Sequence, residues 1–309
     1  EFVECLCDLF LIDESKPIET FKQMLHQKFG EGIANKFLIP YNEKLYAVDL
    51  DALSVDAMGR FFPYANKEEI IRNFRRSSNQ SYNSFFLYPK RGAVRIIDAV
   101  AESVDKSKIC LGEKVLQVDC AAHLIVTNRR TIHYDNLIST MPLPNLLDLC
   151  NIDYNRKIYS WNKVLVFNLG FDSKGPERTN DWIYYPNKDV VFYRVGFYDN
   201  IIGQDKTSVY VEIGFNKDTA ITNIEDWLHR VLSDLQKVGA INQQHLVAEH
   251  HIILDPAYVH ISTESELDKQ HQMSILQKED IYSIGRYGAW KYCSLEDNIQ
   301  DAITLARSF

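Results

Sequence analysis

The chain has 309 residues, which at roughly 150 residues per domain predicts about two domains. Hydrophobic residues make up 46% of it and charged residues 25%, as in ordinary globular proteins. Its 34 Lys and Arg against 42 Asp and Glu argue against a nucleic-acid-binding protein, because such proteins rely on clustered positive charge. No apolar run approaches the roughly 18 residues of a membrane span, and no signal-peptide pattern opens the chain.

The first 88 residues are expected to be mainly helical and irregular. Apolar residues recur at helical spacing over residues 21–29, after a helix-starting Pro17. We expect two further helices over residues 33–37 and 67–76, the first of them ended by Pro40.

From residue 89 onward the pattern changes to a mixture of helix and short strands. An amphipathic helix over 93–104 is followed by expected strands at 109–111, 115–118, 124–126, 131–133 and 137–140. Longer strands are expected at 164–169, 190–197, 208–215 and 247–254, with one helix at 225–238. A helix at 267–276, a buried strand at 281–284 and a closing helix at 295–306 complete the chain.

Common catalytic and metal motifs are missing from the sequence. Gly30-Glu31-Gly32 superficially resembles a dinucleotide loop, but a helix precedes it and Asn35 takes the place of the third glycine, so we interpret it as a helix–helix turn. His250 and His251 are adjacent on a strand and point to opposite faces, so they cannot chelate one metal together.

The six cysteines are scattered, with no Cys-x-x-Cys pair. We therefore expect reduced structural thiols, no metal and a cytoplasmic location. Because the sequence begins with Glu1 rather than methionine, we expect it to be part of a longer gene product.

Tyrosines, arginines and glycines gather at the ends of predicted elements. The segments are Tyr184-Tyr185-Pro186, Phe192-Tyr193-Arg194 and the run from Gly285 to Tyr292. They have two interpretations from spacing alone: turns with surface aromatics, or anion recognition in which guanidinium groups bind phosphate and glycines let a ligand approach the backbone.

These segments resemble the UDP-galactopyranose mutase branch of the FAD-dependent amine-oxidase-like flavoproteins. The similarity runs in order through Phe29-Gly30-x-Gly32-Ile33-Ala34, Pro40-Tyr41-Asn42-x-Lys44-Leu45, Gly59-Arg60, Tyr88-Pro89 with Arg91-Gly92, Ser139-Thr140-Met141, Tyr184-x-Pro186, Phe192-Tyr193-Arg194 and Gly285-Arg286-Tyr287-Gly288-x-Trp290-Lys291-Tyr292. The glycine-rich strand–loop–helix that cradles the FAD pyrophosphate in this family is not in the sequence.

The resemblance implies an α/β fold with α+β insertions. Its parts would be a helical substrate-side insertion at 1–88, a portion of a Rossmann-like FAD domain at 89–150 and 278–309, and an antiparallel-sheet substrate domain at 151–277.

The resemblance also implies site residues, carried over by position. A nucleotide sugar would be bound by Asn42, Tyr46, Asn83, Tyr184, Tyr258 and Tyr292, and its diphosphate would be flanked by the catalytic pair Arg60 and Arg194. FAD would be approached by Arg91, Gly92, Gly285, Arg286 and Trp290. Two departures from the family pattern are Ala93 after Arg91-Gly92 and Asp301 in the last helix, where relatives have glycine.

The activity that the resemblance implies is flavin-dependent conversion of UDP-galactopyranose to UDP-galactofuranose, with FAD in its reduced form, within polysaccharide biosynthesis. An FAD oxidoreductase of the amine-oxidase or protoporphyrinogen-oxidase type acting on another substrate is the first alternative. A non-catalytic fragment that binds a nucleotide sugar is the second. The expected partner is a small molecule, with no nucleic acid and no membrane span, and a homo-oligomer is left open.

Overall fold

The structure, a computed structural model, describes residues 1–62, 66–75 and 85–309. The chain forms two compact units: Glu1–Tyr88 with Trp161–His260 (unit 1), and Pro89–Ser160 with Ile261–Phe309 (unit 2). In this grouping the N-terminal helical segment shares a unit with the antiparallel sheet, and residues 261–277 fall in the other unit. The three-part division expected from the sequence stays a prediction.

The first part of unit 1 is helical, as expected. Its elements are α1 (Phe2–Phe10), α2 (Phe21–Ile33), the π-helix η1 (Ala34–Leu38), α3 (Ile39–Tyr46), the 3₁₀ turns η2 (Leu50–Ala52) and η3 (Gly59–Phe61), and α4 (Lys67–Arg75). Thr20 caps the start of α2, since its side chain accepts a hydrogen bond from the Gln23 amide. Gly30 forms a kink inside α2 with a φ of 73°, which only glycine adopts readily, and a Cβ there would lie 2.9 Å from the backbone of Asp8.

The prediction that Pro40 ends a helix over 33–37 was wrong. The helical backbone continues through η1 into α3, and Pro40 lies in the first turn of α3. Proline is tolerated in a first turn because its missing amide hydrogen would have no intrahelical acceptor there.

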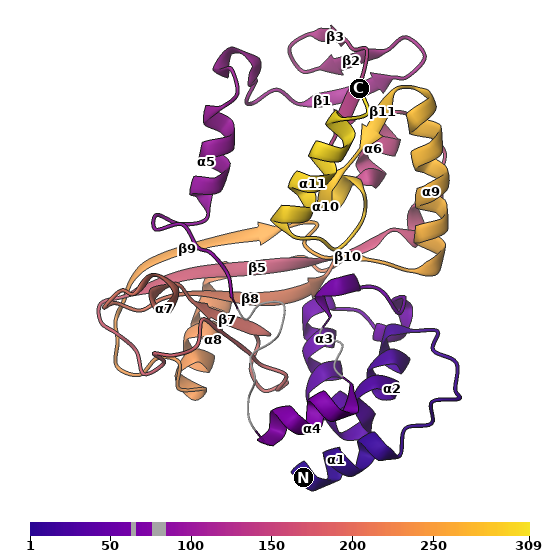
Figure 1. Ribbon diagram of the computed structural model, residues 1–309. Coiled ribbons are helices and arrows are strands. Elements are labelled where there is room, and N and C mark those ends of the chain that lie inside the picture. Colours follow the sequence, from indigo (N-terminus) through magenta and orange to yellow (C-terminus); the bar gives the residue numbers. More distant parts are fainter. Residues whose placement is uncertain (63–65, 76–84) are drawn as a thin grey trace. The chain divides into compact units, whose positions relative to one another are not determined.

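The second part of unit 1 is a six-stranded, largely antiparallel sheet (Figure 1). Its elements are β5 (Ser160–Phe171), β6 (Trp182–Tyr184), β7 (Arg194–Phe197), α7 (Tyr198–Ile202), β8 (Ser208–Asn216), α8 (Ile224–Lys237), β9 (Leu246–Leu254) and β10 (Val259–His260). The strand order is β10-β5-β8-β7-β6, and β9 pairs with β5. The antiparallel sheet that the resemblance implied is therefore confirmed.

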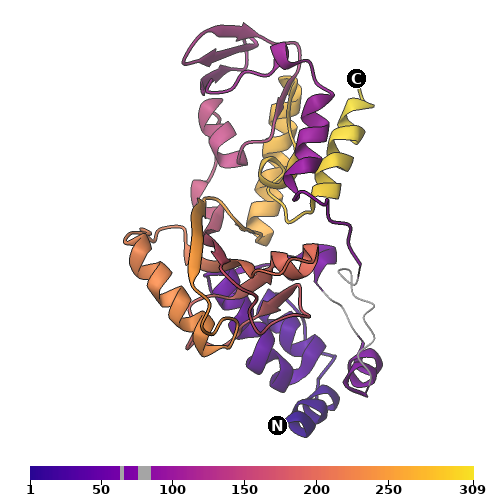
Figure 2. The same ribbon diagram turned by 90° about the vertical axis from the view of Figure 1, so that its left-hand side faces the viewer.

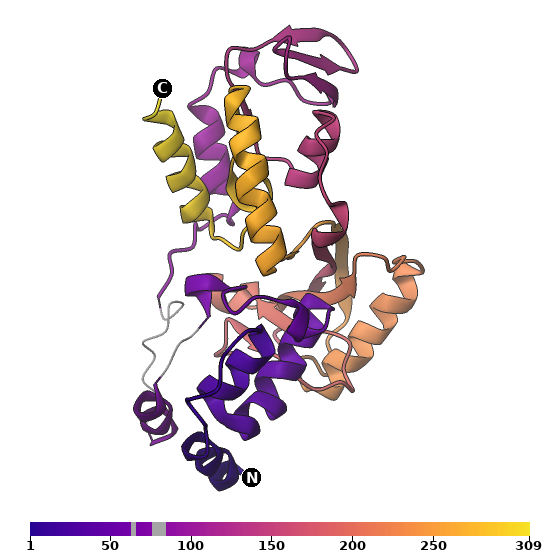
Figure 3. The same ribbon diagram turned by 90° about the vertical axis from the view of Figure 1, so that its right-hand side faces the viewer.

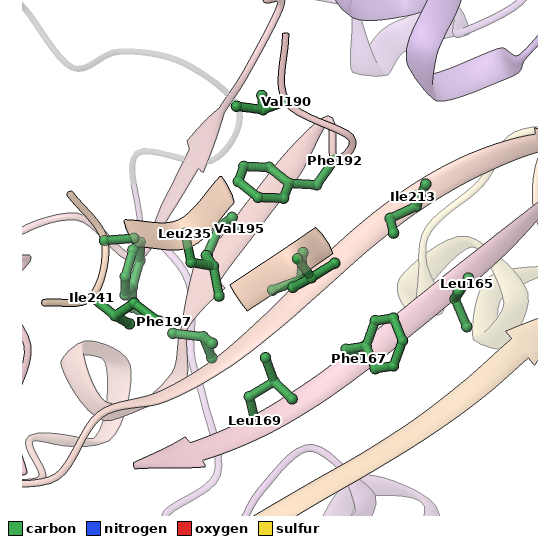
Figure 4. Packing of buried hydrophobic residues seen from close by; sticks show 14 of the residues in the cluster. Leu165, Phe167, Leu169, Val190, Phe192, Val195, Phe197, Ile213, Leu235 and Ile241 are labelled. Carbon is green, nitrogen blue, oxygen red and sulfur yellow. The ribbon is translucent and has the colours of Figure 1, made fainter. Parts of the chain in front are cut away.

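One face of this sheet packs against α8 and forms the main core (Figure 2). Alternate residues of β5, β7 and β8 point into it, as the two-residue side-chain period of a strand requires. Figure 4 shows this packing, in which Leu165, Phe167, Val195, Phe197 and Ile213 from the strands meet Leu235 from α8. The opposite face of the same strands carries Arg194, Tyr210 and Glu212, and so has a different chemistry.

The strand expected over 190–197 is shorter than predicted, because its first four residues belong to the loop between β6 and β7. Val190 and Phe192 point into the core, but their carbonyl oxygens accept hydrogen bonds from the side chain of Lys44. The Val191 amide donates to the carboxylate of Asp234. Side chains thus bond to the backbone of residues 190–192, whereas the Tyr193 amide already donates to the Glu212 carbonyl of β8.

Unit 2 contains α5 (Val94–Glu102), η4 (Lys106–Lys108), β1 (Val115–Asp119), β2 (Leu124–Thr127), β3 (Thr131–His133), β4 (Leu137–Ser139), α6 (Leu143–Leu149), η5 (Arg156–Ile158), α9 (Thr263–Lys278), β11 (Ile281–Ser283), α10 (Gly285–Gly288) and α11 (Leu295–Ala306). The strands β1, β2 and β3 form an antiparallel meander at one end of the unit (Figure 3). Residues 109–111 are not a strand, since they lead into a turn at Gly112, whose φ is 65°.

β4 and β11 pair in parallel, with Ser139 opposite Ser283. Ligands of open α/β sheets bind beyond the carboxyl ends of such strands. Among the described helices, none combines the length and the apolar character that crossing a membrane requires.

Gly214 of β8 lies where α3 packs directly on the sheet. A Cβ added there would lie 2.1 Å from the carbonyl oxygen of Lys44. We expect Gly214→Ala to lower the free energy of unfolding by about 1–3 kcal/mol, since backbone has to move to admit the methyl group. Gly170→Ala in β5 is the matched control, because its nearest neighbour is the Ala248 side chain at 3.4 Å. Urea denaturation measures both, and equal losses in the two variants would contradict the close approach of α3.

Candidate functional site

Helix α3 is held on the sheet through its last carbonyl groups. A helix leaves these oxygens without intrahelical partners. Three sheet residues donate to them, namely Asn162 to Leu45, His260 to Tyr46 at 2.9 Å and Asn216 to Ala47 at 3.4 Å. The position of α3 along the sheet is therefore set by hydrogen bonds as well as by apolar packing.

Arg194 and Glu212 form a largely buried ion pair on the sheet face away from α8. The two residues are directly opposite each other on β7 and β8. An Nη2 of Arg194 lies 2.6 Å from Oε1 of Glu212, and the side chains are only 24% and 12% exposed. Arg194 Nε is buried and has no hydrogen-bond partner among the described residues. Nε–H of Arg194 is thus a hydrogen-bond donor that could bind a ligand.

Tyrosines surround this ion pair. The Tyr41 ring of α3 packs 4.9 Å from Tyr184 and 6.2 Å from Tyr193, and Arg194 lies 5.6 Å from the Tyr210 ring. Gly196 makes room for that last ring, because a Cβ there would lie 1.9 Å from it. We name as the Arg194 cluster the residues Tyr184, Tyr193, Arg194, Tyr198, Tyr210, Glu212 and Tyr258.

The cluster supplies hydroxyl groups and one cation. Burial raises the pKa values of Tyr193, Tyr198 and Tyr210, so these phenols stay protonated near neutral pH. A guanidinium group stays charged in any protein environment. This arrangement can bind an oxygen-rich ligand, and it contains no serine, cysteine or histidine nucleophile.

Three of the residues implied by the resemblance come together here: Arg194, Tyr184 and Tyr258. The ring of Tyr258 lies 6.1 Å from that of Tyr46, which links the cluster to α3. Asn42 and Tyr46 themselves are buried, and the Asn42 amide donates to the Leu38 carbonyl one turn earlier. Direct contact with a ligand would require movement around these side chains, so their role in binding a nucleotide sugar stays a prediction.

Two further residues implied by the resemblance, Arg60 and Asn83, are not among the residues of the Arg194 cluster. Arg60 is exposed on η3 with its guanidinium 4.8 Å from the Phe61 ring, and its pairing with Arg194 around a diphosphate stays a prediction. Asn83 lies in the part of the chain that the structure does not describe.

Sequence reasoning missed Glu212 and the neighbouring Tyr210. The signal for them is present in β8, where Tyr210 and Glu212 are the large polar residues on the face that alternates with buried Val209, Val211 and Ile213. A carboxylate on one face of an otherwise apolar strand predicts a buried partner cation.

Two of the implied cofactor residues of unit 2, Gly285 and Arg286, lie beyond the parallel strands. Gly285 follows β11 with a φ of 79°. Gly288 lies so close to the end of β4 that a Cβ on it would be 3.0 Å from the Ser139 carbonyl oxygen. Arg286 lies with its guanidinium 5.0 Å from the Tyr292 ring and donates to the Cys293 carbonyl.

The other cofactor assignments have different surroundings. Trp290 is fully buried and packs edge-on against Tyr159 at 5.4 Å, so its ring lies in the core of unit 2. Arg91 is exposed, and Gly92 forms the turn before α5 with a φ of 91°. Asp301, a departure from the family pattern, pairs with Lys291 at 2.8 Å.

The residues at the carboxyl ends of β4 and β11 fit a flavin. The Ser139 hydroxyl is buried there and has no hydrogen-bond partner among the described residues. Gly285 and Arg286 follow at the same edge, where the fold places nucleotide cofactors. For metals the finding differs: within the described ranges, no group of three or more His, Cys, Asp and Glu side chains is arranged to hold an ion.

Comparison with known proteins adds a family and a fold. The profile of the family "flavin containing amine oxidoreductase" matches residues 7–304. The crystal structure of reduced UDP-galactopyranose mutase is similar with a TM-score of 0.84 and 24% identity, over 94% of this chain and 68% of that one. A protein named provisionally as a protoporphyrinogen oxidase, from Exiguobacterium sp. 255-15, has a TM-score of 0.76 and 16% identity, over 99% of this chain and 71% of that one. A fatty acid isomerase from P. acnes has a TM-score of 0.59 and 11% identity, over 89% of this chain and 63% of that one. Identities this low show a shared fold only.

His260 makes the docking of α3 sensitive to acid. Burial lowers the pKa of His260 from 6.5 to about 4. A lowered folded-state pKa means that its stabilising contribution is complete above pH 6.5 and is lost as the pH falls through 4. At 1.36 kcal/mol per pKa unit, this loss is roughly 3 kcal/mol.

We therefore expect His260→Gln to flatten the dependence of unfolding free energy on pH between 6.5 and 4. The exposed His229 gives the control variant His229→Gln, which should keep the slope of the natural protein. Identical pH profiles for the two variants would show that His260 is not buried as a neutral side chain.

Proposed function

We propose, from the premise that the chain belongs to the flavin containing amine oxidoreductase family, that it is a flavin-dependent sugar-nucleotide mutase. The reaction would be of the UDP-galactopyranose to UDP-galactofuranose type, or that of a close relative in polysaccharide biosynthesis. The observation that carries the proposal is the Arg194 cluster, in which one guanidinium group lies among tyrosine hydroxyls.

The cluster has the chemistry that a sugar diphosphate needs. Guanidinium groups bind phosphate oxygens with charge-assisted hydrogen bonds, and Nε of Arg194 is a donor with no partner among the described residues. Protonated phenols bind sugar and phosphate oxygens and fix their orientation. The similarity in fold to a UDP-galactopyranose mutase supports the same ligand class.

The chain's own residues would bind, orient and stabilise charge. In this family a bound flavin supplies the covalent or redox chemistry. Arg194, together with Arg60, would stabilise the negative charge that develops on a departing diphosphate. Tyr184 and Tyr258 would hold the sugar in place. Such a division of labour requires no side-chain nucleophile, in agreement with the composition of the cluster.

A second candidate is an FAD-dependent oxidoreductase that acts on a different substrate. The specific observation in its favour is Glu212, whose carboxylate neutralises Arg194 at 2.6 Å. A neutral ion pair suits an uncharged or mixed ligand better than a diphosphate. The two candidates therefore differ in what removal of the Glu212 charge would do.

Calorimetric titration of the purified protein with UDP separates them. If Arg194 binds the diphosphate, Glu212→Gln should strengthen UDP binding, because the carboxylate no longer competes for the guanidinium group. The double variant Arg194→Gln/Glu212→Gln should weaken it at least about tenfold, which corresponds to ~1.4 kcal/mol. The double variant is preferred to Arg194→Ala because a single change would leave Glu212 charged and buried.

The control is the double variant Lys174→Gln/Asp199→Asn, which neutralises another buried ion pair of unit 1 at 2.5 Å. It should bind UDP like the natural protein. Unchanged UDP affinity in both Arg194 cluster variants would exclude the diphosphate role. Absence of any UDP binding to a flavin-loaded protein would favour the oxidoreductase, and UDP binding by a protein that takes up no flavin would favour the non-catalytic chain that binds a nucleotide sugar.

A further inference from the structure

The loop between β6 and β7, residues 185–192, is organised around a single cation. Nζ of Lys44 lies between 2.5 and 3.0 Å from four carbonyl oxygens of this loop. These belong to Tyr185, Asn187, Val190 and Phe192. Two of them come from the outgoing limb of the loop and two from the returning limb, so the ammonium group connects the limbs to each other.

The loop needs this connection because its limbs do not form a ladder along their length. The Tyr185 amide donates to the Tyr193 carbonyl and closes the loop at its base. Beyond that point the side of the loop near α8 is held by Asp234, which accepts from the Val191 amide, and by Lys237, which donates to the Asp189 carbonyl. The four carbonyl oxygens named above bond instead to Lys44. An ammonium group has three hydrogens, so it satisfies several acceptors at once.

The same turn of α3 also contacts the residues that flank the loop. Tyr41 lies three residues before Lys44, and residues at this spacing share one helix face. The Tyr41 ring packs against Tyr184 at the end of β6 and against Tyr193 just before β7. Tyr184 pairs directly with Arg194 across the two strands. Helix α3 therefore contacts both ends of the loop as well as its interior.

We propose that Lys44 is a positioning residue: its ammonium group orders the 185–192 loop and thereby sets Tyr184, Tyr193 and Arg194 in the Arg194 cluster. The inference about the loop is independent of the ligand, whereas its effect on UDP binding rests on the proposed function. Partial burial lowers the pKa of Lys44 to about 8, and the nearby carboxylates of Asp189 and Asp234 act in the opposite direction by favouring the charged form.

Neighbouring charges do not replace this ammonium group. Lys188 is on the loop itself, but it is 77% exposed and pairs with Glu43 at 3.3 Å. That interaction is a surface ion pair, which contributes little to order. Lys188→Ala is therefore the matched control, since it removes a cation from the same loop and leaves the four carbonyl bonds intact.

The test combines hydrogen exchange with chemical rescue. In Lys44→Met, which keeps an unbranched side chain one atom shorter and without the charge, the amides of residues 185 and 187–193 should exchange at least about tenfold faster. Lys44→Ala should do the same, and n-propylammonium, which matches the atoms removed, should restore slow exchange in it. Propan-1-ol should not restore it, because the alcohol has no charge. Lys188→Ala should exchange like the natural protein.

The UDP affinity of the same variants, measured on the flavin-loaded protein, tests the positioning step. It should fall about tenfold in Lys44→Met and Lys44→Ala and recover with n-propylammonium in the latter. Exchange within about twofold of the natural protein in both variants would overturn the proposal, as would faster exchange with unchanged UDP affinity. If the natural protein binds no UDP while exchange still responds to Lys44 and to n-propylammonium, the proposed function fails and the ordering of the loop by Lys44 stands.

Discussion

The docking of α3 on the sheet is the constraint on which unit 1 depends. A short helix gains little stability from its own hydrogen bonds, so its position has to come from tertiary contacts. Here the contacts are polar and directional: Asn162, His260 and Asn216 donate to the last three carbonyls of the segment that ends α3. Gly214 lets the helix backbone touch the strand. These contacts fix both the depth and the direction of α3, which brings Tyr41 and Lys44 to the loop.

The two faces of the sheet differ in their side chains: one supplies the apolar core and the other carries the ion pair of Arg194 and Glu212. The face toward α8 is apolar throughout and supplies the core. The other face buries an ion pair, and burial of two charges costs nearly as much free energy as their attraction returns. A largely buried pair of this kind contributes little net stability, which leaves it available for the ligand-binding role proposed above.

Local patterns predicted the elements well and the site only in part. Strict alternation identified β8, and α11 was predicted within its observed bounds, because both depend on residues close in sequence. The strand expected over 190–197 is confirmed only over Arg194–Phe197, because the residues before it bond to Lys44 and Asp234, which are distant in sequence. Glu212 was missed for the same reason: its partner Arg194 lies on another strand, and the pairing follows from sheet register. The buried state of Tyr46 and Trp290 also depends on such long-range packing.

The two cations beside this loop have different partners, and this difference gives them different roles. Arg194 is bound to a carboxylate, a single side chain with which the anionic ligand of the proposed function would compete. Lys44 is bound to four backbone carbonyls, whose positions are fixed by the chain itself, and a ligand cannot take its place without unfolding the loop. Arg194 would thus change its partner when a ligand binds, while Lys44 keeps its four carbonyl partners. The loop beside the cluster would then not have to reorganise. Preorganisation of this kind is what charge stabilisation in a binding site requires.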